Sequence, residues 1–451
     1  MVVDVFGLLN RKFLRTGTMQ IQERIQSILK KRALHQTAFV TIGSLINGVS
    51  LLALNVVLAR ALSQELFGIF SLSVLALSTM AEISDFGLNA GLLRFAPYYI
   101  ATNQIDKLKQ LVKTIWRWRV TLTWVLTVGG IVFSYPLAKY LFGQPKISPY
   151  LAYSFLGVGG VVLLGFLATF LQSRQRFFYQ ASVQSLKGFL RLLIVVILAL
   201  AGVKNLFAYL SVYIFVPWIL FLANYGVFPE KFRKVEIDGE VKRNLNSQLA
   251  KFSFWLTISS LMAIAGGKID QVMISHYLGL EQVAVFTVAW QLIQVFPILY
   301  GSISSVLIPK VSALGNKTDL VAFVKRVFKW VFVGTIGIAL LIYPSQYLIN
   351  FLFGPKYVAA MPIYLVLAYG FLLNILAIPF SMAVTIFNKT HIMAIGAFFQ
   401  TAILIICNLI FIPRYGIMGV AYTYIISLVG NFVWNTVWAL YLIKKKDFNI
   451  V

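Results

Sequence analysis

Charged side chains inside long apolar runs are the residues of this sequence whose positions suggest chemistry. Lys268 and Asp270 lie within the apolar run 252–278, and each costs roughly 2.5 to 3.5 kcal/mol at the centre of a bilayer. Lys187 and Arg191 lie four residues apart in another such run, and therefore on one face of a helix. All four should face protein or water and not lipid. In such a place the three cations could bind an anion that crosses the membrane.

Two carboxylates in the run 66–90 are the next candidates. Glu82 and Asp85 lie three residues apart, and therefore on one side of a helix. Since a buried carboxylate usually has a cationic partner, we expect them to pair with Arg94 or a basic neighbour. The alternative is that these carboxylates bind a coupling cation or proton.

Each intramembrane cation also has a structural alternative. Lys268 could pair with Asp270, but residues two apart on a regular helix point away from each other. Lys187 could extend to the cytoplasmic headgroups, because it lies only about 10 Å into its run. Arg191 lies deeper, which favours a place on a hydrated path. Arg60, at the outer end of the first run, is expected to anchor the membrane interface, and contact with a departing substrate is its alternative.

The composition indicates the class of protein that holds these side chains. Of the 451 residues, 59% are hydrophobic and 12% are charged, which is typical of an all-α polytopic membrane protein. The net charge is +25, but Lys and Arg fall in short blocks between apolar runs, where the positive-inside rule explains them. Without an aromatic and basic binding module, nucleic-acid binding is not expected. Cys407 is the only cysteine, so the sequence predicts neither a disulfide nor a cysteine metal cluster.

Twelve apolar runs are each long enough to span a bilayer. They are residues 37–59, 66–90, 120–142, 150–172, 181–203, 206–228, 252–278, 283–307, 327–353, 357–387, 392–412 and 420–443. The segments on the side of the two termini hold 30 of the 39 Lys and Arg residues, against six on the other side. This asymmetry predicts that both termini are cytoplasmic. In the N-terminal segment 1–36, the apolar spacing over 21–31 predicts an amphipathic helix on anionic lipid, with a frayed basic tail as the alternative.

The longest loop between spans, 230–251, separates two similar halves. At a constant offset of 216 residues, the matching pairs are Leu62 with Leu278, Glu65 with Glu281, Gly68 with Ala284, Phe70 with Phe286, Arg94 with Lys310, Lys109 with Lys325 and Lys113 with Lys329. Each half has an even number of spans, so the repeat is parallel. We therefore expect six-helix bundles over 37–229 and 252–443, a cytoplasmic tail over 444–451, and a central cavity between bundles that rock against each other.

Three stretches resemble the polysaccharide flippases of the Wzx type. They are LARALSQELFGIFS at 58–71, ISDFGLNAGLLR at 83–94 and KIDQVMISHYLG at 268–279. These flippases share a superfamily with multidrug exporters and lipid II flippases, and the resemblance covers roughly residues 37–443. It implies a two-lobed fold like that of the multidrug exporters, with twelve or fourteen spans and no cofactor.

The resemblance also implies a function and partners. The function is export of an undecaprenyl-pyrophosphate-linked oligosaccharide across the cytoplasmic (inner) membrane by alternating access, for cell-surface polysaccharide biosynthesis. The partners are the lipid-linked oligosaccharide and membrane lipids, with a polysaccharide polymerase or the export machinery as a further candidate. A pyrophosphate carries concentrated negative charge, so its path needs fixed cations. The candidate substrate-binding residues are Lys268, Arg191, Lys187 and Arg60. The candidates for ion coupling or structural pairing are Asp85, Glu82, Asp270 and Arg94.

Two other classes of function remain as alternatives. A lipid II or multidrug exporter would share the fold, but a carrier of cationic drugs should present carboxylates, whereas lone buried Lys and Arg would repel its substrate. An intramembrane glycan-modifying enzyme would need an acid/base or metal constellation. The three histidines, His35, His276 and His391, lie in different parts of the chain. We therefore predict no catalytic residue and no metal site, and do not expect an enzyme.

Overall fold

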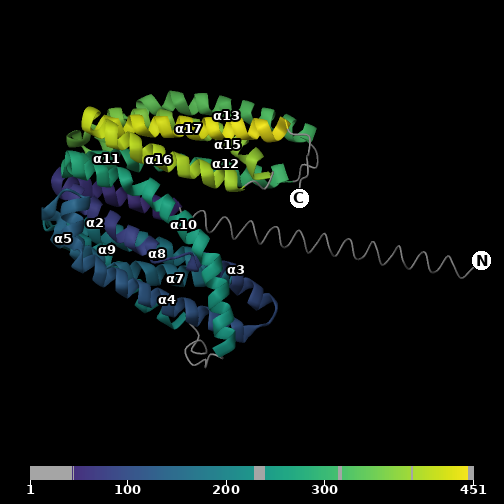
Figure 1. The fold of residues 1–451 in the computed structure, drawn as a ribbon. Coiled ribbons are helices and arrows are strands. Elements are labelled where there is room, and N and C mark those ends of the chain that lie inside the picture. Colours follow the sequence, from purple (N-terminus) through teal and green to yellow (C-terminus); the bar gives the residue numbers. More distant parts are fainter. Residues whose placement is uncertain (1–42, 44, 228–238, 313–316, 387–389, 445–451) are drawn as a thin grey trace, which may run out of the picture.

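A computed structural model describes residue 43 and residues 45–227, 239–312, 317–386 and 390–444 (Figure 1). Within these ranges the chain is almost entirely helical and forms no strand. The apolar runs account for this, because a bilayer offers the backbone no hydrogen bonds and a single segment can satisfy its own only as a helix. The amphipathic helix predicted over 21–31 lies outside the described residues.

The first half of the chain forms a series of helices joined by short turns. They are a helix over Leu45–Ala61, α2 (Gln64–Ile83), α3 (Leu88–Ala101), α4 (Ile105–Val132), α5 (Ser134–Pro136), η1 (Leu137–Leu141), η2 (Pro145–Ile147), α6 (Ser148–Phe155), α7 (Val158–Ser173), α8 (Phe177–Leu200), α9 (Leu206–Ala223) and η3 (Tyr225–Val227).

The second half repeats this plan with longer helices. They are α10 (Gly239–Leu278), α11 (Leu280–Ile293), α12 (Val295–Ser312), α13 (Lys317–Ser345), α14 (Tyr347–Phe353), η5 (Pro355–Tyr357), α15 (Ala360–Ile386), α16 (Thr390–Tyr415) and α17 (Ile417–Lys444). Because α10 begins at Gly239, residues 239–251 of the predicted loop 230–251 are helical.

By length and composition, eight helices of the described part could cross a membrane, or up to ten if each bent pair is one span. The bent pairs are α4 with the segment Ser134–Leu141, bent by 63°, and Pro145–Phe155 with α7, bent by 42°. The remaining two predicted runs fall on the helix Leu45–Ala61, which is shorter, and on α10, which has 40 residues. The chain is therefore an all-α, multi-pass membrane protein, as predicted.

The predicted second span, 66–90, is not one continuous helix. It breaks between α2 and α3, where Phe86 and Gly87 adopt positive φ angles of 43° and 67°. Such left-handed residues end helices, and glycine adopts this conformation without a steric cost. The break puts Asp85 in a turn, where its Oδ1 accepts a hydrogen bond of 3.2 Å from the backbone amide of Asn89. Hydropathy did not reveal the break, because the apolar residues on both sides of it outweigh the polar Ser84, Asp85 and Asn89.

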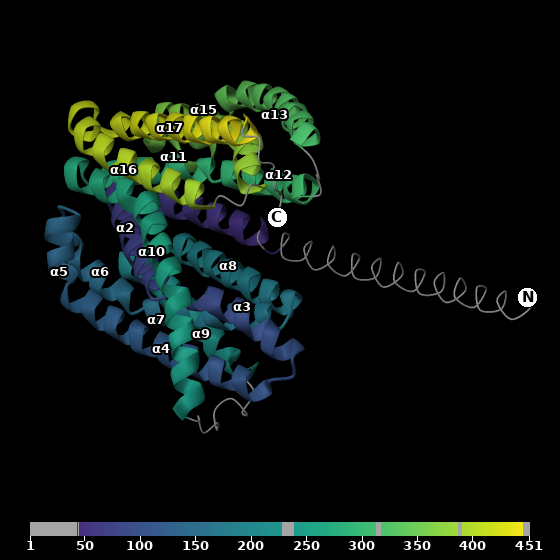
Figure 2. The ribbon, with the colours of Figure 1, turned by 45° about the vertical axis from the view of Figure 1, so that its right-hand side comes forward.

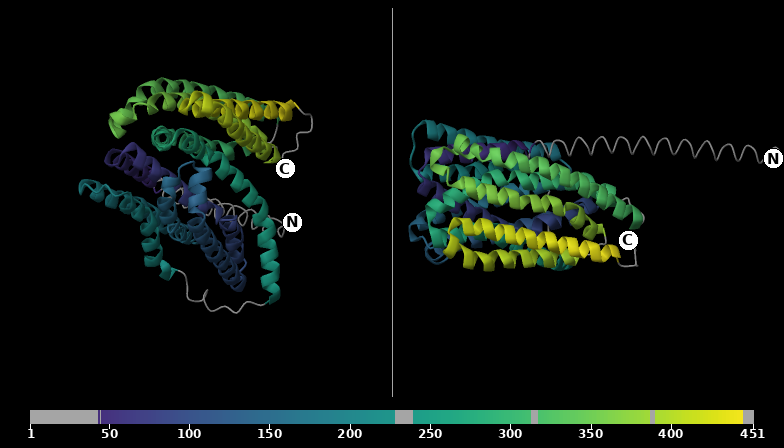
Figure 3. Two further views of the ribbon diagram at one scale, coloured as in Figure 1. Left: turned by 60° about the vertical axis from the view of Figure 1, so that its left-hand side comes forward. Right: turned by 90° about the horizontal axis from the view of Figure 1, so that it is seen from above.

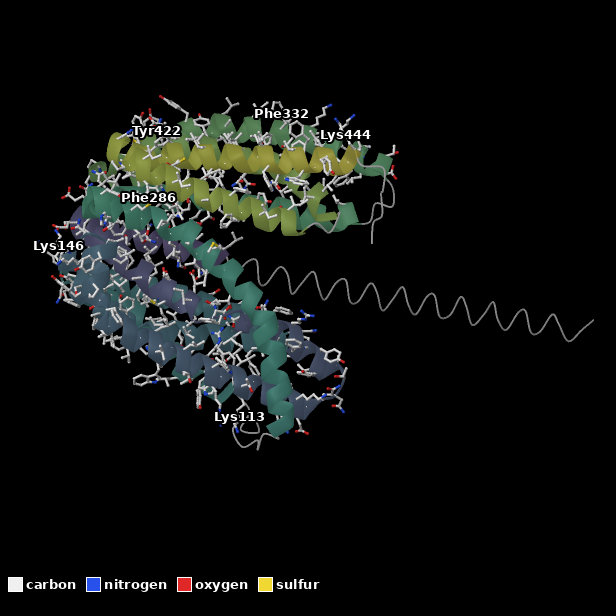
Figure 4. All side chains as sticks on the ribbon, viewed as in Figure 1. Lys113, Lys146, Phe286, Phe332, Tyr422 and Lys444 are labelled. Carbon is white, nitrogen blue, oxygen red and sulfur yellow. The ribbon has the colours of Figure 1, made fainter. Side chains whose placement is uncertain are left out.

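The helices form two groups that follow the two halves (Figures 1 and 2). Helices α2 to α9 lie together, and α11 to α13 lie with α15 to α17; the long helices of both groups run in similar directions (Figure 3). Helix α10 joins the groups, since it contacts α3 and α4 of the first half and α11 and α16 of the second. Lys146 and Lys444 lie at opposite ends of the bundle (Figure 4). Because the charge pattern predicts a cytoplasmic Lys444, we call the Lys146 end the outer end.

The two groups make a close backbone contact near the outer end, between α2 and α11. A Cβ atom added to Gly68 of α2 would lie only 2.0 Å from the carbonyl oxygen of Leu280. Only a glycine permits this approach. Phe67 and Val283, one on each helix, are fully buried beside it. The two halves therefore meet tightly at the outer end.

Candidate functional site

Lys268 of α10 contacts α2 and so links the two halves. Its Nζ lies 2.9 Å from Glu82 Oε2 and donates a hydrogen bond of 3.2 Å to Ser78 Oγ. Ser78 and Glu82 are four residues apart and share one face of α2. The Lys268 side chain is 19% exposed and that of Glu82 is 50% exposed. Other side chains therefore cover this ion pair only in part, and Asp270 is not the partner of Lys268.

Asp270 points to the interior of the second half. It is 2% exposed, and its Oδ1 accepts a 2.5 Å hydrogen bond from Nδ2 of Asn408 on α16. The hydroxyl of Tyr424 on α17 is a second hydrogen-bond partner. The ion pairs among the described residues leave Asp270 without a cationic partner. Its carboxylate is therefore held by neutral groups alone.

One further oxygen atom beside Asp270 is buried without a hydrogen-bond partner among the described residues. It is Oδ1 of Asn408, the residue whose Nδ2 donates to Asp270. Oxygen atoms of this kind are ligands for hard cations or acceptors for a proton donor. Asn408 and Tyr424 were missed from the sequence, because their polar atoms are single positions in long apolar helices.

Asp85 pairs with Arg119 of α4, whereas the prediction named Arg94 or a basic neighbour. Arg119 is 2% exposed; its Nη1 donates a 3.2 Å hydrogen bond to the carbonyl of Val162, and its guanidinium lies 5.6 Å from the ring centre of Phe166. The pair fixes the break between α2 and α3 against two other helices. Arg119 was missed because it directly precedes the predicted run 120–142. The signal that could have identified it is the series of basic residues before that run, which lies on the same helix as the run.

Arg191 of α8 packs against α9 inside the first half. Its Nη2 donates a 3.0 Å hydrogen bond to the carbonyl of Tyr213, and its guanidinium lies 4.3 Å from the centre of the Tyr213 ring. Pro217 follows Tyr213 by four residues within α9. Since proline has no amide hydrogen, it cannot donate to the carbonyl four residues earlier. Arg191 therefore satisfies the backbone acceptor that Pro217 leaves free, which is a structural reason for its burial.

This arrangement predicts that Arg191 and Pro217 are energetically coupled. Arg191→Met should leave the Tyr213 carbonyl unpaired, at a cost of about 1 to 3 kcal/mol. Pro217→Ala restores the missing amide donor, so Arg191→Met should cost less in that background. Thermal unfolding of the purified protein in detergent measures both penalties, with Lys187→Met on the same face of α8 as a control. Equal penalties for Arg191→Met in both backgrounds would contradict the coupling.

The other predicted residues make different contacts. Lys187 is half-buried on α8, one turn before Arg191, and Arg94 of α3 lies 5.6 Å from the ring centre of Phe95. Arg60 is at the outer end, where it contacts the second half: its Nε donates to the carbonyl of Leu352 at 2.7 Å. The structure thus pairs Arg191 with α9, Lys268 with α2 and Arg60 with the end of α14. One wall formed by Lys187, Arg191 and Lys268 stays a prediction.

Comparison with known proteins identifies the family. Residues 34–314 match the model of the polysaccharide biosynthesis protein family. The chain belongs to this family. Over 381 residues, 79% of this chain and 73% of the relative, it is 25% identical to an uncharacterized membrane protein of Methanocaldococcus jannaschii. Over 205 residues, 42% of this chain and 50% of the relative, it is 29% identical to the capsular polysaccharide biosynthesis protein CapF of Staphylococcus aureus.

Several solved structures share the fold of this chain. The lipid II flippase MurJ, in an inward closed conformation, matches with a TM-score of 0.71 and 13% identity, over 90% of this chain and 93% of MurJ. An inward-facing multidrug transporter of the MATE family and MOP superfamily matches with a TM-score of 0.66 and 13% identity, over 88% of this chain and 94% of that one. An outward-facing structure of a transporter of the same family and superfamily matches with a TM-score of 0.53 and 15% identity, over 91% of this chain and 94% of that one.

Proposed function

We propose that this protein is a flippase that carries undecaprenyl-pyrophosphate-linked oligosaccharides across the cytoplasmic membrane by alternating access. The observation that carries the proposal is the ion pair between Lys268 and Glu82, because it joins the two halves and is covered by other side chains only in part. A fixed cation between two moving halves suits a substrate whose charge is concentrated in a diphosphate. The family of the chain and its fold support the same substrate class, but they do not indicate which sugars the oligosaccharide contains.

Exchange of partners at Lys268 explains how substrate could drive a change of state. Without substrate, Glu82 neutralises Lys268 and holds α10 against α2. A diphosphate offers stronger charge-assisted hydrogen bonds than a half-exposed carboxylate, so it can displace Glu82 from Lys268. A ligand shifts a conformational equilibrium only by its differential affinity for the two states. Here the difference arises because substrate binding breaks one of the links between the halves.

Asp270 is our candidate for the coupling group. A carboxylate that is buried with neutral partners alone is costly, and it becomes stable when it takes up a proton or a cation. The unpartnered Oδ1 of Asn408 supports this role. Asp85 is paired with the buried Arg119, which supports a structural part for it. Glu82 serves the substrate path, and Arg94 stays a candidate for structural pairing.

A lipid II flippase is the second candidate, because MurJ shares the fold. A carrier of cationic drugs is disfavoured, because Lys268 would repel its substrate. The experiment that tests the proposal is depletion of the protein, followed by mass spectrometry of the lipid-linked intermediates in each leaflet. A polysaccharide precursor on undecaprenyl pyrophosphate should accumulate in the inner leaflet. Accumulation of lipid II, or of no intermediate, would contradict the proposed substrate.

The proposed coupling role makes a prediction for Asp270→Asn. The amide is isosteric and cannot ionise, so transport should no longer respond to an imposed proton or sodium gradient. Transport rates in proteoliposomes, with and without the gradient, measure this response. Asp106→Asn is the control, since Asp106 is 85% exposed and pairs with Lys109 on the same helix at 2.8 Å. A gradient response of Asp270→Asn equal to that of the parent protein would remove Asp270 from coupling.

A further inference from the structure

Two contacts between turns join the halves at the outer end. In the first, residues 59–64, which run from the last turn of the first helix to the start of α2, meet the segment 351–357 of the second half. In the second, residues 275–279 at the end of α10 meet the segment 142–144 of the first half. The offset of 216 residues relates Ala59 to Ser275, and the Leu-Phe-Gly at 141–143 recurs at 352–354 with an offset of 211, so the two contacts occupy equivalent places in the predicted repeat. We call them the Arg60 contact and the Ser275 contact.

In the Arg60 contact, a cation of the first half binds carbonyl groups of the second. Arg60 Nε donates to Leu352 O at 2.7 Å and its Nη2 donates to Phe351 O at 2.5 Å. These carbonyls belong to the last turn of α14, where a helix has no amide donors left for them. The partial negative charge of a helix C-terminus also favours a cation there.

The same contact is reinforced by a cation in the opposite direction. Lys356, in the second half, donates from Nζ to the carbonyl of Leu62 in the first half at 2.6 Å. Gln64 Nε2 in turn donates to the carbonyl of Lys356 at 2.5 Å. Each half therefore gives one positive charge to neutral backbone oxygens of the other half. Both cations are exposed, so an anion can reach them.

The Ser275 contact achieves a similar junction with neutral groups. Ser275 Oγ donates to Phe142 O at 2.9 Å, and Gln144 Nε2 donates to Ser275 O at 3.3 Å. Neutral side chains are thus sufficient to join two turns in this fold. The two charges of the Arg60 contact exceed what closure requires, and neither has an anionic partner among the ion pairs of the described residues.

We propose that Arg60 and Lys356 form an exit-side anion site, in which they exchange backbone carbonyls for the diphosphate of the departing lipid-linked substrate when the outer end opens. The inference rests on the proposed flippase function and adds the residues that receive the headgroup on the outer side. Arginine presents a planar fork that matches phosphate oxygens, and charge-assisted hydrogen bonds are stronger than those to neutral carbonyls. The anion therefore favours the open state, because the closed state uses both cations for itself.

The test measures opening at Leu62, which is 3% exposed in the closed contact. Cys407 is replaced by alanine, Leu62 by cysteine, and the rate of labelling by a membrane-impermeant maleimide is measured in proteoliposomes. Added farnesyl diphosphate should accelerate labelling, whereas farnesol should not. In Arg60→Gln with Lys356→Gln, the farnesyl diphosphate concentration for half-maximal acceleration should rise by about tenfold or more.

Two control variants separate this site from general charge at the outer end. Lys146→Gln removes a cation that pairs with Glu65 of the same half, and it should leave the acceleration unchanged. Arg60→Lys should retain part of it. No acceleration in the parent protein, or equal acceleration in the double Gln variant, would overturn the exit site. The assay requires no glycan, so these outcomes are independent of whether depletion shows the proposed substrate.

Discussion

Lys268→Glu should abolish glycan export, because it places a second carboxylate next to Glu82 and repels the diphosphate. Lys268→Ala should also lose export, and Lys268→Arg should keep much of it because it retains the positive charge. The measurement is glycan export normalised to the amount of protein in the membrane. Normal export by well-expressed Lys268→Ala or Lys268→Glu would remove Lys268 from the substrate path.

The structure predicts that Lys268→Ala itself folds. Its partner Glu82 is half-exposed, and ion pairs in contact with water contribute only about 0 to 1 kcal/mol. The loss of export should therefore come without a comparable loss of protein. Low abundance of Lys268→Ala that is rescued by Glu82→Gln would instead show that the pair serves mainly to hold the fold.

Arg119→Met should cause a large loss of stable protein, for the opposite reason. The Arg119 side chain is 3% exposed, and breaking a buried pair costs roughly 3 to 5 kcal/mol because it leaves Asp85 without its partner. This is a large part of the roughly 5 to 15 kcal/mol that stabilises a typical protein. Thermal unfolding and membrane abundance measure the effect.

Two variants show whether the pair or the position matters in this region. Arg119→Met combined with Asp85→Asn removes both charges and should recover much of the stability. Arg117→Met changes an exposed arginine two residues away on the same helix, and should have little effect. If Arg119→Met were as stable as Arg117→Met, the ion pair would not be what fixes the break between α2 and α3.

The sequence predicted the fold class well because membrane spans depend on local composition. The apolar runs appeared as helices, and the motifs indicated the family. The break at Gly87 was not predicted in the same way, because its cause is a local backbone conformation inside a run that is apolar on average. The two-bundle division and the sidedness of the termini stay predictions that the charge pattern and the repeat support.

Partners of the buried charges were harder to predict than the charges themselves. The sequence correctly marked Glu82, Asp85 and Lys268 as residues that need partners. It could not show that α2 ends at Ile83, so that Glu82 on the helix pairs with Lys268 and Asp85 in the turn pairs with Arg119. Pairing in a helical bundle depends on contacts between residues far apart in the chain, and a single sequence does not contain that information.

Arg191 shows a different limit. Its depth in an apolar run pointed to a hydrated path, whereas the structure places it on the carbonyl freed by Pro217. Arg191 and Pro217 were both visible in the sequence, but the hydrogen bond from Arg191 to the carbonyl that Pro217 leaves free depends on how α8 packs against α9.

Transport of a defined substrate by the purified protein tests the flippase account most directly. Proteoliposomes would contain the protein and a fluorescent oligosaccharide on undecaprenyl pyrophosphate, and an impermeant glycosidase or quencher would report its appearance in the outer leaflet. The parent protein should move the lipid at a rate well above that of empty vesicles, and Lys268→Glu should not. Equal rates for the parent protein, Lys268→Glu and empty vesicles would contradict the proposed function.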